Sequence, residues 1–134
     1  MTRGIHPAVL ADQGLPAALE HLALSSGVPV RVDSRLTGRL PATVETTAYF
    51  VISEALTNVI KHANATHAIV RLHHARGVLR IEITDDGVGG AAIRPGSGLA
   101  GLADRVAALG GTLQVAAAPG SGTEVRAGLP AAEH

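Results

Sequence analysis

The stretch that decides the fold is PATVETTAYFVISEALTNVIKHA, residues 41–63. Its apolar side chains recur every three or four residues, which predicts one long helix with a single apolar face. That face comprises Val44, Ala48, Val51, Ile52, Ala55, Leu56, Val59, Ile60 and Ala63. Because successive helical residues turn by about 100°, the other side of the helix collects Thr47, Phe50, Glu54, Thr57, Asn58 and Lys61. A helix of this kind has to pack against a second layer, and the flanking residues are expected to supply it.

Shorter periodic segments flank this helix on both sides. On the N-terminal side we expect a helix at 15–26 that ends at Gly27, and a short edge strand at 28–33 that includes Pro29. On the C-terminal side the expected order is strands at 68–73 and 79–84 joined by a turn at 75–77, a helix at 99–109, and strands at 112–117 and 123–129. This order predicts an α/β (α+β) sandwich, with a mixed, mostly antiparallel sheet that carries the helices on one face.

Length and composition limit the classes of protein that the chain can belong to. The 134 residues are enough for one domain, whose core must be aliphatic because Tyr49 and Phe50 are the only aromatic residues. Residues 1–14 have no clear period and are expected to form a connector, and residues 15–131 to form the domain. The net charge of zero gives no footprint for nucleic acid or an anionic membrane. Without cysteine, disulfides, thiolate metal sites and cysteine nucleophiles are excluded. We expect a cytoplasmic segment.

Glu54, Asn58 and Lys61 form the first group of candidate site residues. An Asn side-chain oxygen suits one position on an octahedral Mg²⁺ that keeps its waters and phosphate oxygens. A Glu one turn away can orient a water, and a Lys on the same stripe can meet a phosphate. A solvated helix face would show the same spacing, so the spacing by itself leaves both interpretations open.

The segment Asp85-x-Gly87-x-Gly89 directly follows a predicted strand. The period of two places Asp85 on the same face as Ile81 and Ile83, where a carboxylate needs a partner. It could accept the exocyclic amine of adenine and would repel the corresponding oxygen of guanine. The alternative interpretation is a simple Asp-Asp-Gly turn.

Two further glycine motifs follow. Gly96-x-Gly98-x-x-Gly101 matches the dinucleotide fingerprint, but it lies outside any parallel strand–helix–strand unit, so we reject that interpretation. A glycine loop that opens a helix still presents free backbone N–H groups to an anion. In Gly122-Thr123, the Thr123 hydroxyl points to the core side and needs a partner, although strand propensity alone also explains a threonine there. The seven histidines show no convincing metal-ligand spacing.

The order of these motifs resembles that of the ATP-binding catalytic domain of sensor histidine kinases. Residues 54–63 look like the N box of that family, residues 85–89 like its G1 box and residues 98–102 like its G2 box, and Gly122-Thr123 follows. The Lys61-His62-Ala63 ending and residues 101–105 look most like the nitrate-sensor-like subfamily, whose partners are LuxR-type response regulators. Residues 4–15 resemble the tail that joins the dimerisation helices to this domain.

The resemblance implies the Bergerat fold, with ATP and Mg²⁺ as cofactors. It implies that Asn58 binds the metal and that Glu54 supports the metal and phosphate chemistry. Lys61 and His62 would face phosphates, and Asp85 would take the adenine amine. The remaining implied contacts are Gly87 and Gly89 in the adenine wall, Gly98, Leu99 and Gly101 in the lid over the phosphates, and Thr123 behind the adenine pocket.

The chain departs from the family at the phosphoacceptor, which is a histidine followed by an acidic residue on a long helix. Here Pro7 follows His6 and Leu22 follows His21. We therefore expect a histidine kinase domain that transfers the ATP γ-phosphate to a histidine on a dimerisation helix absent from this chain, for relay to a response regulator. The chain alone is expected not to autophosphorylate. The alternatives are a non-catalytic nucleotide-binding regulatory module and an anti-sigma-factor serine kinase.

Overall fold

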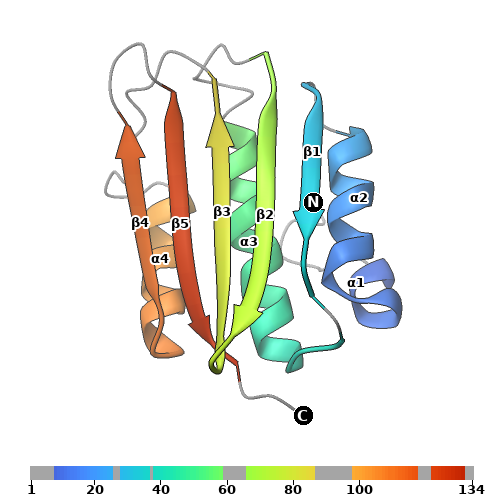
Figure 1. Ribbon diagram of the computed structural model, residues 1–134. Helices are drawn as coiled ribbons and strands as arrows, with labels where there is room; N and C mark the ends of the chain where they lie inside the picture. The colour runs from blue at the N-terminus through green and yellow to red at the C-terminus, as the bar shows by residue number, and fades with distance from the viewer. Residues whose placement is uncertain are drawn as a thin grey trace.

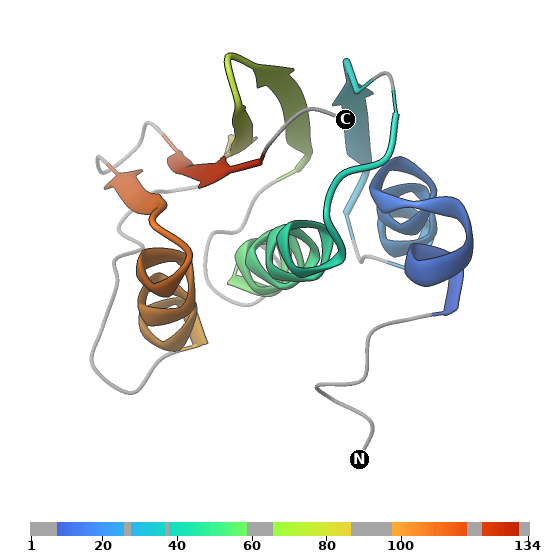
Figure 2. The ribbon, with the colours of Figure 1, turned by 90° about the horizontal axis from the view of Figure 1, so that it is seen from below.

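The chain folds into a five-stranded sheet with helices packed on one of its faces (Figures 1 and 2). The computed structural model describes residues 8–25, 28–36, 38–58, 66–86, 98–117 and 122–131. In chain order the elements are α1 (Ala8–Gln13), α2 (Leu15–Ser25), β1 (Val30–Ser34), α3 (Ala42–Asn58), β2 (Ala68–Ala75), β3 (Val78–Asp85), α4 (Gly98–Ala108), β4 (Thr112–Ala117) and β5 (Thr123–Pro130). Within these residues, no helix combines the length and the apolar character that crossing a bilayer requires.

The strands pair in the order β1-β2-β3-β5-β4. The β1–β2 pair is parallel and the other three pairs are antiparallel, so the predicted mixed, mostly antiparallel sheet is confirmed. β1 lies at one edge, as Pro29 before it predicts. The turn between β2 and β3 consists of Arg76 and Gly77, with φ angles of 56° and 74°. Two left-handed residues in a two-residue loop match the twist of the strands that they join.

The apolar face of α3 forms the centre of the core. Six of its nine predicted members are at most 4% exposed, namely Val44, Ala48, Val51, Ile52, Ala55 and Leu56. The other three, Val59, Ile60 and Ala63, lie outside the described residues. The six described members share one core cluster with inward side chains of the strands, such as Leu72 and Ile81, which are 1% exposed. Burial of this aliphatic surface is the main favourable contribution to folding.

The side of α3 opposite the apolar face is also partly covered. Thr47 is buried and Phe50 is half-buried. α4 packs beside α3. The Arg105 guanidinium of α4 lies 5.9 Å from the centre of the Phe50 ring, and Tyr49 meets the same ring edge-on at 5.7 Å. A helix between a sheet and a second helix has less solvent-facing surface than its own periodicity indicates.

The segment before α2 contains a helix that its sequence does not reveal. Within residues 1–14, for which we predicted no periodic structure, α1 spans Ala8–Gln13, and its Leu10 is 2% exposed. The Arg39 guanidinium donates hydrogen bonds to the carbonyl oxygens of Leu10 and Ala11, at 3.3 and 3.2 Å. The same group pairs with the buried Glu45 carboxylate of α3 at 2.9 Å. Arg39 thereby joins the end of α1 to the start of α3.

Candidate functional site

The candidate site lies at the upper end of the sheet in Figure 1, where several elements end or begin. β3 ends there at Asp85, β5 begins there at Thr123, the described part of α3 ends there at Asn58, and α4 begins there at Gly98. Motifs that are widely separated in the sequence therefore meet at one end of the molecule.

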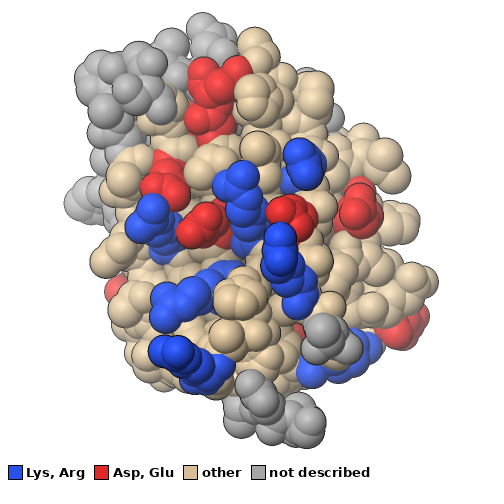
Figure 3. All heavy atoms as spheres, viewed as in Figure 1, with Lys and Arg blue, Asp and Glu red and all other residues tan. Residues whose placement is uncertain are grey.

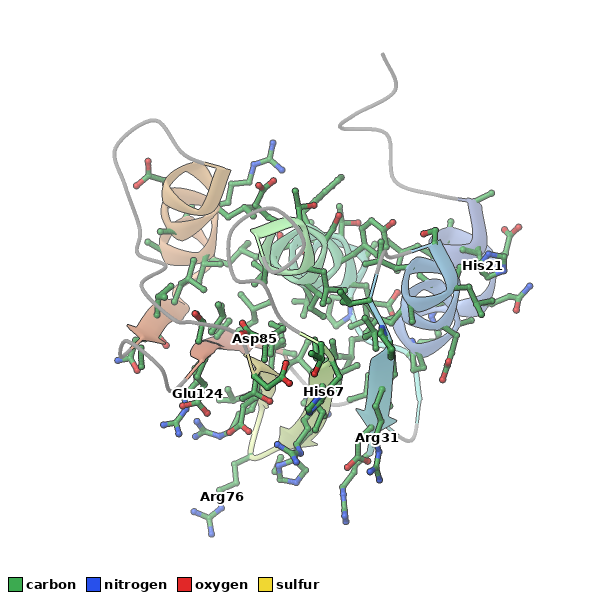
Figure 4. The ribbon with its side chains drawn as sticks, turned by 90° about the horizontal axis from the view of Figure 1, so that it is seen from above. His21, Arg31, His67, Arg76, Asp85 and Glu124 are labelled. Carbon is green, nitrogen blue, oxygen red and sulfur yellow. The ribbon has the colours of Figure 1, made fainter. Side chains whose placement is uncertain are left out.

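Asp85 occupies the inward position that strand alternation predicts. It pairs in register with Ala68, which is 1% exposed, and shares a face with the buried Ile81 and Ile83. Figure 4 shows Asp85 on the helix side of the sheet and Glu124 on the open side. Asp85 itself is half-buried, so its carboxylate stands between the core and solvent. Such a position suits an acceptor for a ligand that enters from the upper end.

Thr123 presents a buried hydroxyl beside Asp85. The β3–β5 register ends at the pair Thr84–Glu124, so the next residues along, Asp85 and Thr123, are neighbours on the inward face. Thr123 is 8% exposed, and its Oγ1 has no hydrogen-bond partner among the described residues. A buried hydroxyl without a partner costs about 1–3 kcal/mol, which a polar ligand at this position would offset.

Gly122 brings the start of β5 against the end of β3. Its φ of +79° belongs to the left-handed region that glycine adopts without strain. A Cβ at this position would overlap the backbone carbonyl of Asp85. Glycine is therefore required at residue 122 for the contact that sets Asp85 beside Thr123. The sequence motif Gly122-Thr123 pointed to the Thr123 hydroxyl, whereas the need for glycine at residue 122 comes from the tertiary contact with Asp85.

Asp86 anchors the strand end that carries Asp85. Its Oδ1 accepts hydrogen bonds from the backbone N–H groups of Thr66 and His67, at 2.8 and 3.0 Å. Its other oxygen accepts the Thr66 hydroxyl and lies 3.2 Å from Nδ1 of His67. These bonds, above all that from the Thr66 hydroxyl, hold the pKa of Asp86 well below its ordinary value. Sequence reasoning missed this role, because the partners lie about 20 residues earlier.

On α3, the structure describes part of the first candidate group. Glu54 is half-buried, and Asn58 lies one helical turn further along, at the end of the described helix. Nothing is described of the Asn58 side chain. Lys61, His62, Gly87 and Gly89 lie outside the described residues. The roles that the resemblance implies for all these residues remain predictions.

Gly98, Leu99 and Gly101 belong to the first turn of α4. The backbone N–H groups of a first turn have no partner within the helix and carry the positive end of its dipole. No acidic residue occupies this turn, so an anion that approaches it meets no carboxylate from the helix itself. A Cβ on Gly101 would meet nothing within 4 Å, so packing does not require the glycine.

Comparisons with known proteins point to one family. The family model described as histidine kinase-, DNA gyrase B-, and HSP90-like ATPase matches residues 43–133. The chain is 34% identical to the sensor histidine kinase MctS of Rhizobium johnstonii over 141 aligned residues, which cover 97% of this chain and 30% of that protein. It is 37% identical to the sensor histidine kinase NarS of Mycobacterium tuberculosis over 137 aligned residues, covering 94% of this chain and 32% of NarS.

A solved structure agrees with these sequence relatives. The blue-light activated histidine kinase of Erythrobacter litoralis EL346 superimposes with a TM-score of 0.73 and 26% identity, over 87% of this chain and 41% of that one. The chain thus spans about a third of the length of the curated relatives MctS and NarS. The predicted fold class is confirmed by the observed sheet and by this likeness.

Proposed function

This chain belongs to the family of histidine kinase-, DNA gyrase B- and HSP90-like ATPases, and we propose that it is the ATP-binding catalytic domain of a sensor histidine kinase. The observation that carries the proposal is the inward Asp85 carboxylate beside the Thr123 hydroxyl, which has no partner among the described residues. Both groups lie at the sheet end where α4 begins. A base-recognising pair and an anion-binding helix start are the two features that a nucleotide site needs.

In this proposal each group has a separate task. The Asp85 carboxylate accepts the adenine amine, and the Thr123 hydroxyl completes the polar edge of the base site. The first turn of α4, with Gly98, Leu99 and Gly101, faces the phosphates. Lys61 and His62 would add positive charge or hydrogen-bond donors there, and Gly87 and Gly89 would shape the adenine wall.

Mg²⁺ belongs to the proposal through two residues of α3. Asn58 would bind the ion through its amide oxygen, and Glu54, one turn before it, would orient a bound water. The ion would supply charge neutralisation at the phosphates. Within the described residues, no group of three or more His, Asp or Glu side chains could hold a metal by itself. Asn58 and Glu54 alone therefore fit a magnesium ion that is held largely by phosphate and water.

The proposed reaction is transfer of the γ-phosphoryl group of ATP to a histidine nitrogen. Positioning and charge neutralisation account for most catalysis of this kind. The acceptor histidine would lie on the dimerisation helices of the longer protein, which is in keeping with the share of MctS and NarS that this chain spans. The phosphoryl group would then pass to a response regulator, and the chain would work in the cytoplasm.

Two finer assignments rest on sequence alone. The ending Lys61-His62-Ala63 and residues 101–105 support a nitrate-sensor-like kinase whose regulator is of the LuxR type. A non-catalytic nucleotide-binding module and an anti-sigma-factor serine kinase remain the alternatives from the sequence. The similarity to named sensor histidine kinases over nearly the whole chain does not favour either of them.

Nucleotide titration of Asp85→Asn tests the proposed base site. A hydrogen bond to a charged group contributes about 1.5–3 kcal/mol, so the variant should bind ATP at least about tenfold more weakly. Calorimetry with ATP and GTP measures this, and circular dichroism checks that the fold survives. Equal affinity of the wild-type chain for ATP and GTP would refute recognition of adenine by Asp85.

A further inference from the structure

The open face of the sheet carries rows of charged side chains. The helices cover the other face (Figure 2). On the open face, outward residues of neighbouring strands lie side by side in register. One row runs Asp33–Arg71–Glu82–Arg126 across β1, β2, β3 and β5, with opposite charges at each step. Cross-strand pairs of opposite charge neutralise one another, so this balanced row needs no ligand.

The next row, nearer the β2–β3 turn, contains no carboxylate. His73 and Arg80 are a register pair on β2 and β3, and Gly128 follows on β5 without a side chain. Next to β2 on its other side, the backbone N–H of Arg35 donates to the carbonyl oxygen of Leu72 at 2.9 Å. This bond continues the alignment of β1 with β2, so Arg35 falls in the same row as His73. We call Arg35, His73 and Arg80 the basic row. In Figure 3 most of the red patches lie across the middle and upper parts of this face, and the lower part is mainly blue apart from a red patch at its right edge.

A hollow of about 350 Å³ is lined by residues of both rows: Arg35, His73 and Arg80 of the basic row, and Asp33, Arg71 and Glu82 of the balanced row. Among the residues that the structure describes, no hydrogen bond or ion pair engages the side chains of Arg35, His73 or Arg80. In contrast, Arg126 in the balanced row bonds to Glu124 at 3.0 Å. The basic row therefore has donors and positive charge available for a ligand.

We propose that the basic row binds an extended acidic segment of a partner protein. Neighbouring strands lie about 4.8 Å apart, so the row spans roughly 10 Å. Alternate side chains of an extended chain project to one side about 7 Å apart, and two carboxylates at this spacing fit within the row. A nucleic acid or a membrane surface would extend over Asp33, Glu82 and Glu124, which repel it.

Fluorescence anisotropy with the whole 134-residue chain tests this proposal. The probe is a fluorescein-labelled eight-residue peptide of alternating Glu and Ser, and the control peptide has Lys in place of Glu. We expect saturable, salt-sensitive binding of the Glu peptide only. The double variant Arg35→Gln/Arg80→Gln should weaken it by about tenfold, since each exposed ion pair contributes modestly.

Arg126→Gln is the matched control, because it removes one positive charge from the same face but from the balanced row. It should change the affinity less than Arg80→Gln does. Equal effects of these two variants, or binding of the Lys peptide, would overturn the proposal. Displacement of the peptide by inorganic phosphate beyond that by chloride at equal ionic strength would show a small-anion site instead and would also overturn it. Mg·ATP should leave peptide binding unchanged, so the test does not depend on the proposed nucleotide site.

Discussion

At the scale of single residues, Gly122 links backbone geometry to the candidate site. Its left-handed conformation and its contact with the Asp85 carbonyl both exclude a side chain. Gly77 has a similar φ of +74° but open space around its missing Cβ. Comparison of these two glycines separates the cost of the backbone conformation from the cost of the contact.

We predict that Gly122→Ala destabilises the fold more than Gly77→Ala. The second change carries only the cost of a left-handed alanine, about 1–2 kcal/mol. The first adds displacement of the Asp85 backbone and should therefore weaken ATP binding as well. Urea denaturation and nucleotide titration measure the two effects. If both variants lose equal stability and keep full ATP affinity, the contact does not position Asp85.

Asp86 provides a pH-dependent prediction. Its hydrogen bonds from Thr66 and His67 lower its pKa in the folded state, so its contribution to stability is fully present above its ordinary pKa of about 3.9. That contribution is lost as the pH falls through the lower, folded-state pKa. The free energy of unfolding of the wild type should exceed that of Asp86→Asn by a constant amount above about pH 5, and by less towards pH 3.

Urea denaturation at a series of pH values measures this difference. Asp104→Asn is the control, because Asp104 is exposed on α4 and makes no hydrogen bond or ion pair among the described residues. A difference between wild type and Asp86→Asn that stays constant down to pH 3 would contradict the assignment.

At the scale of elements, α1 is held by apolar contacts of Val9 and Leu10 and by one polar link. Leu10 inserts into the core, and Arg39 joins the α1 carbonyls to Glu45 at the start of α3. Gly14, with φ of +93°, lets the chain turn from α1 into α2 while the Arg39 side chain packs against it. Although α1 has only six residues, these contacts make it part of the domain.

We predict that Leu10→Ala lowers the free energy of unfolding by about 2–5 kcal/mol, as for other buried leucines. Leu24→Ala is the matched control, because Leu24 is 87% exposed on the neighbouring helix α2 and should cost less than about 0.5 kcal/mol. Chemical denaturation of both variants gives the comparison. Equal, small losses would mean that α1 is not docked in solution.

At the scale of the whole molecule, we predict that the phosphoacceptor histidine lies outside the proposed nucleotide and metal site. His21 lies on α2 and is followed by the apolar Leu22, so no adjacent carboxylate can orient its imidazole as a general base would. In Figure 4, His21 also lies on the far side of α2 from Asp85. We therefore expect phosphoryl transfer to use a histidine from another segment.

We predict that the chain incubated with γ-labelled ATP and Mg²⁺ remains unlabelled. Addition of the dimerisation helices as a separate polypeptide should give labelling on those helices only. The rate should be low, because two free chains lack the effective concentration of a tethered acceptor. Separation of the two polypeptides on a gel measures the label on each. Acid-labile label on this chain alone would contradict the prediction and direct attention to His21.

Much of the fold follows from local periodicity. The apolar stripe of α3, the alternation of β2 and β3 and the Arg76-Gly77 turn are patterns within a few residues, and these elements were predicted close to their observed bounds. The inward position of Asp85 follows from the same period of two. The hydrophobic effect acts on such patterns wherever they occur in a chain, so they can be recognised without knowledge of the neighbours.

Contacts between distant residues decided the rest. The docking of α1 depends on Arg39, which lies 28 and 29 residues beyond the carbonyls that it binds. The anchoring of Asp86 depends on Thr66, 20 residues earlier. The contact of Phe50 with Arg105 depends on the packing of α4 beside α3. These features are individual polar bonds or helix contacts with no period of their own, so only the tertiary structure, which brings the partners within hydrogen-bonding or packing distance, determines them.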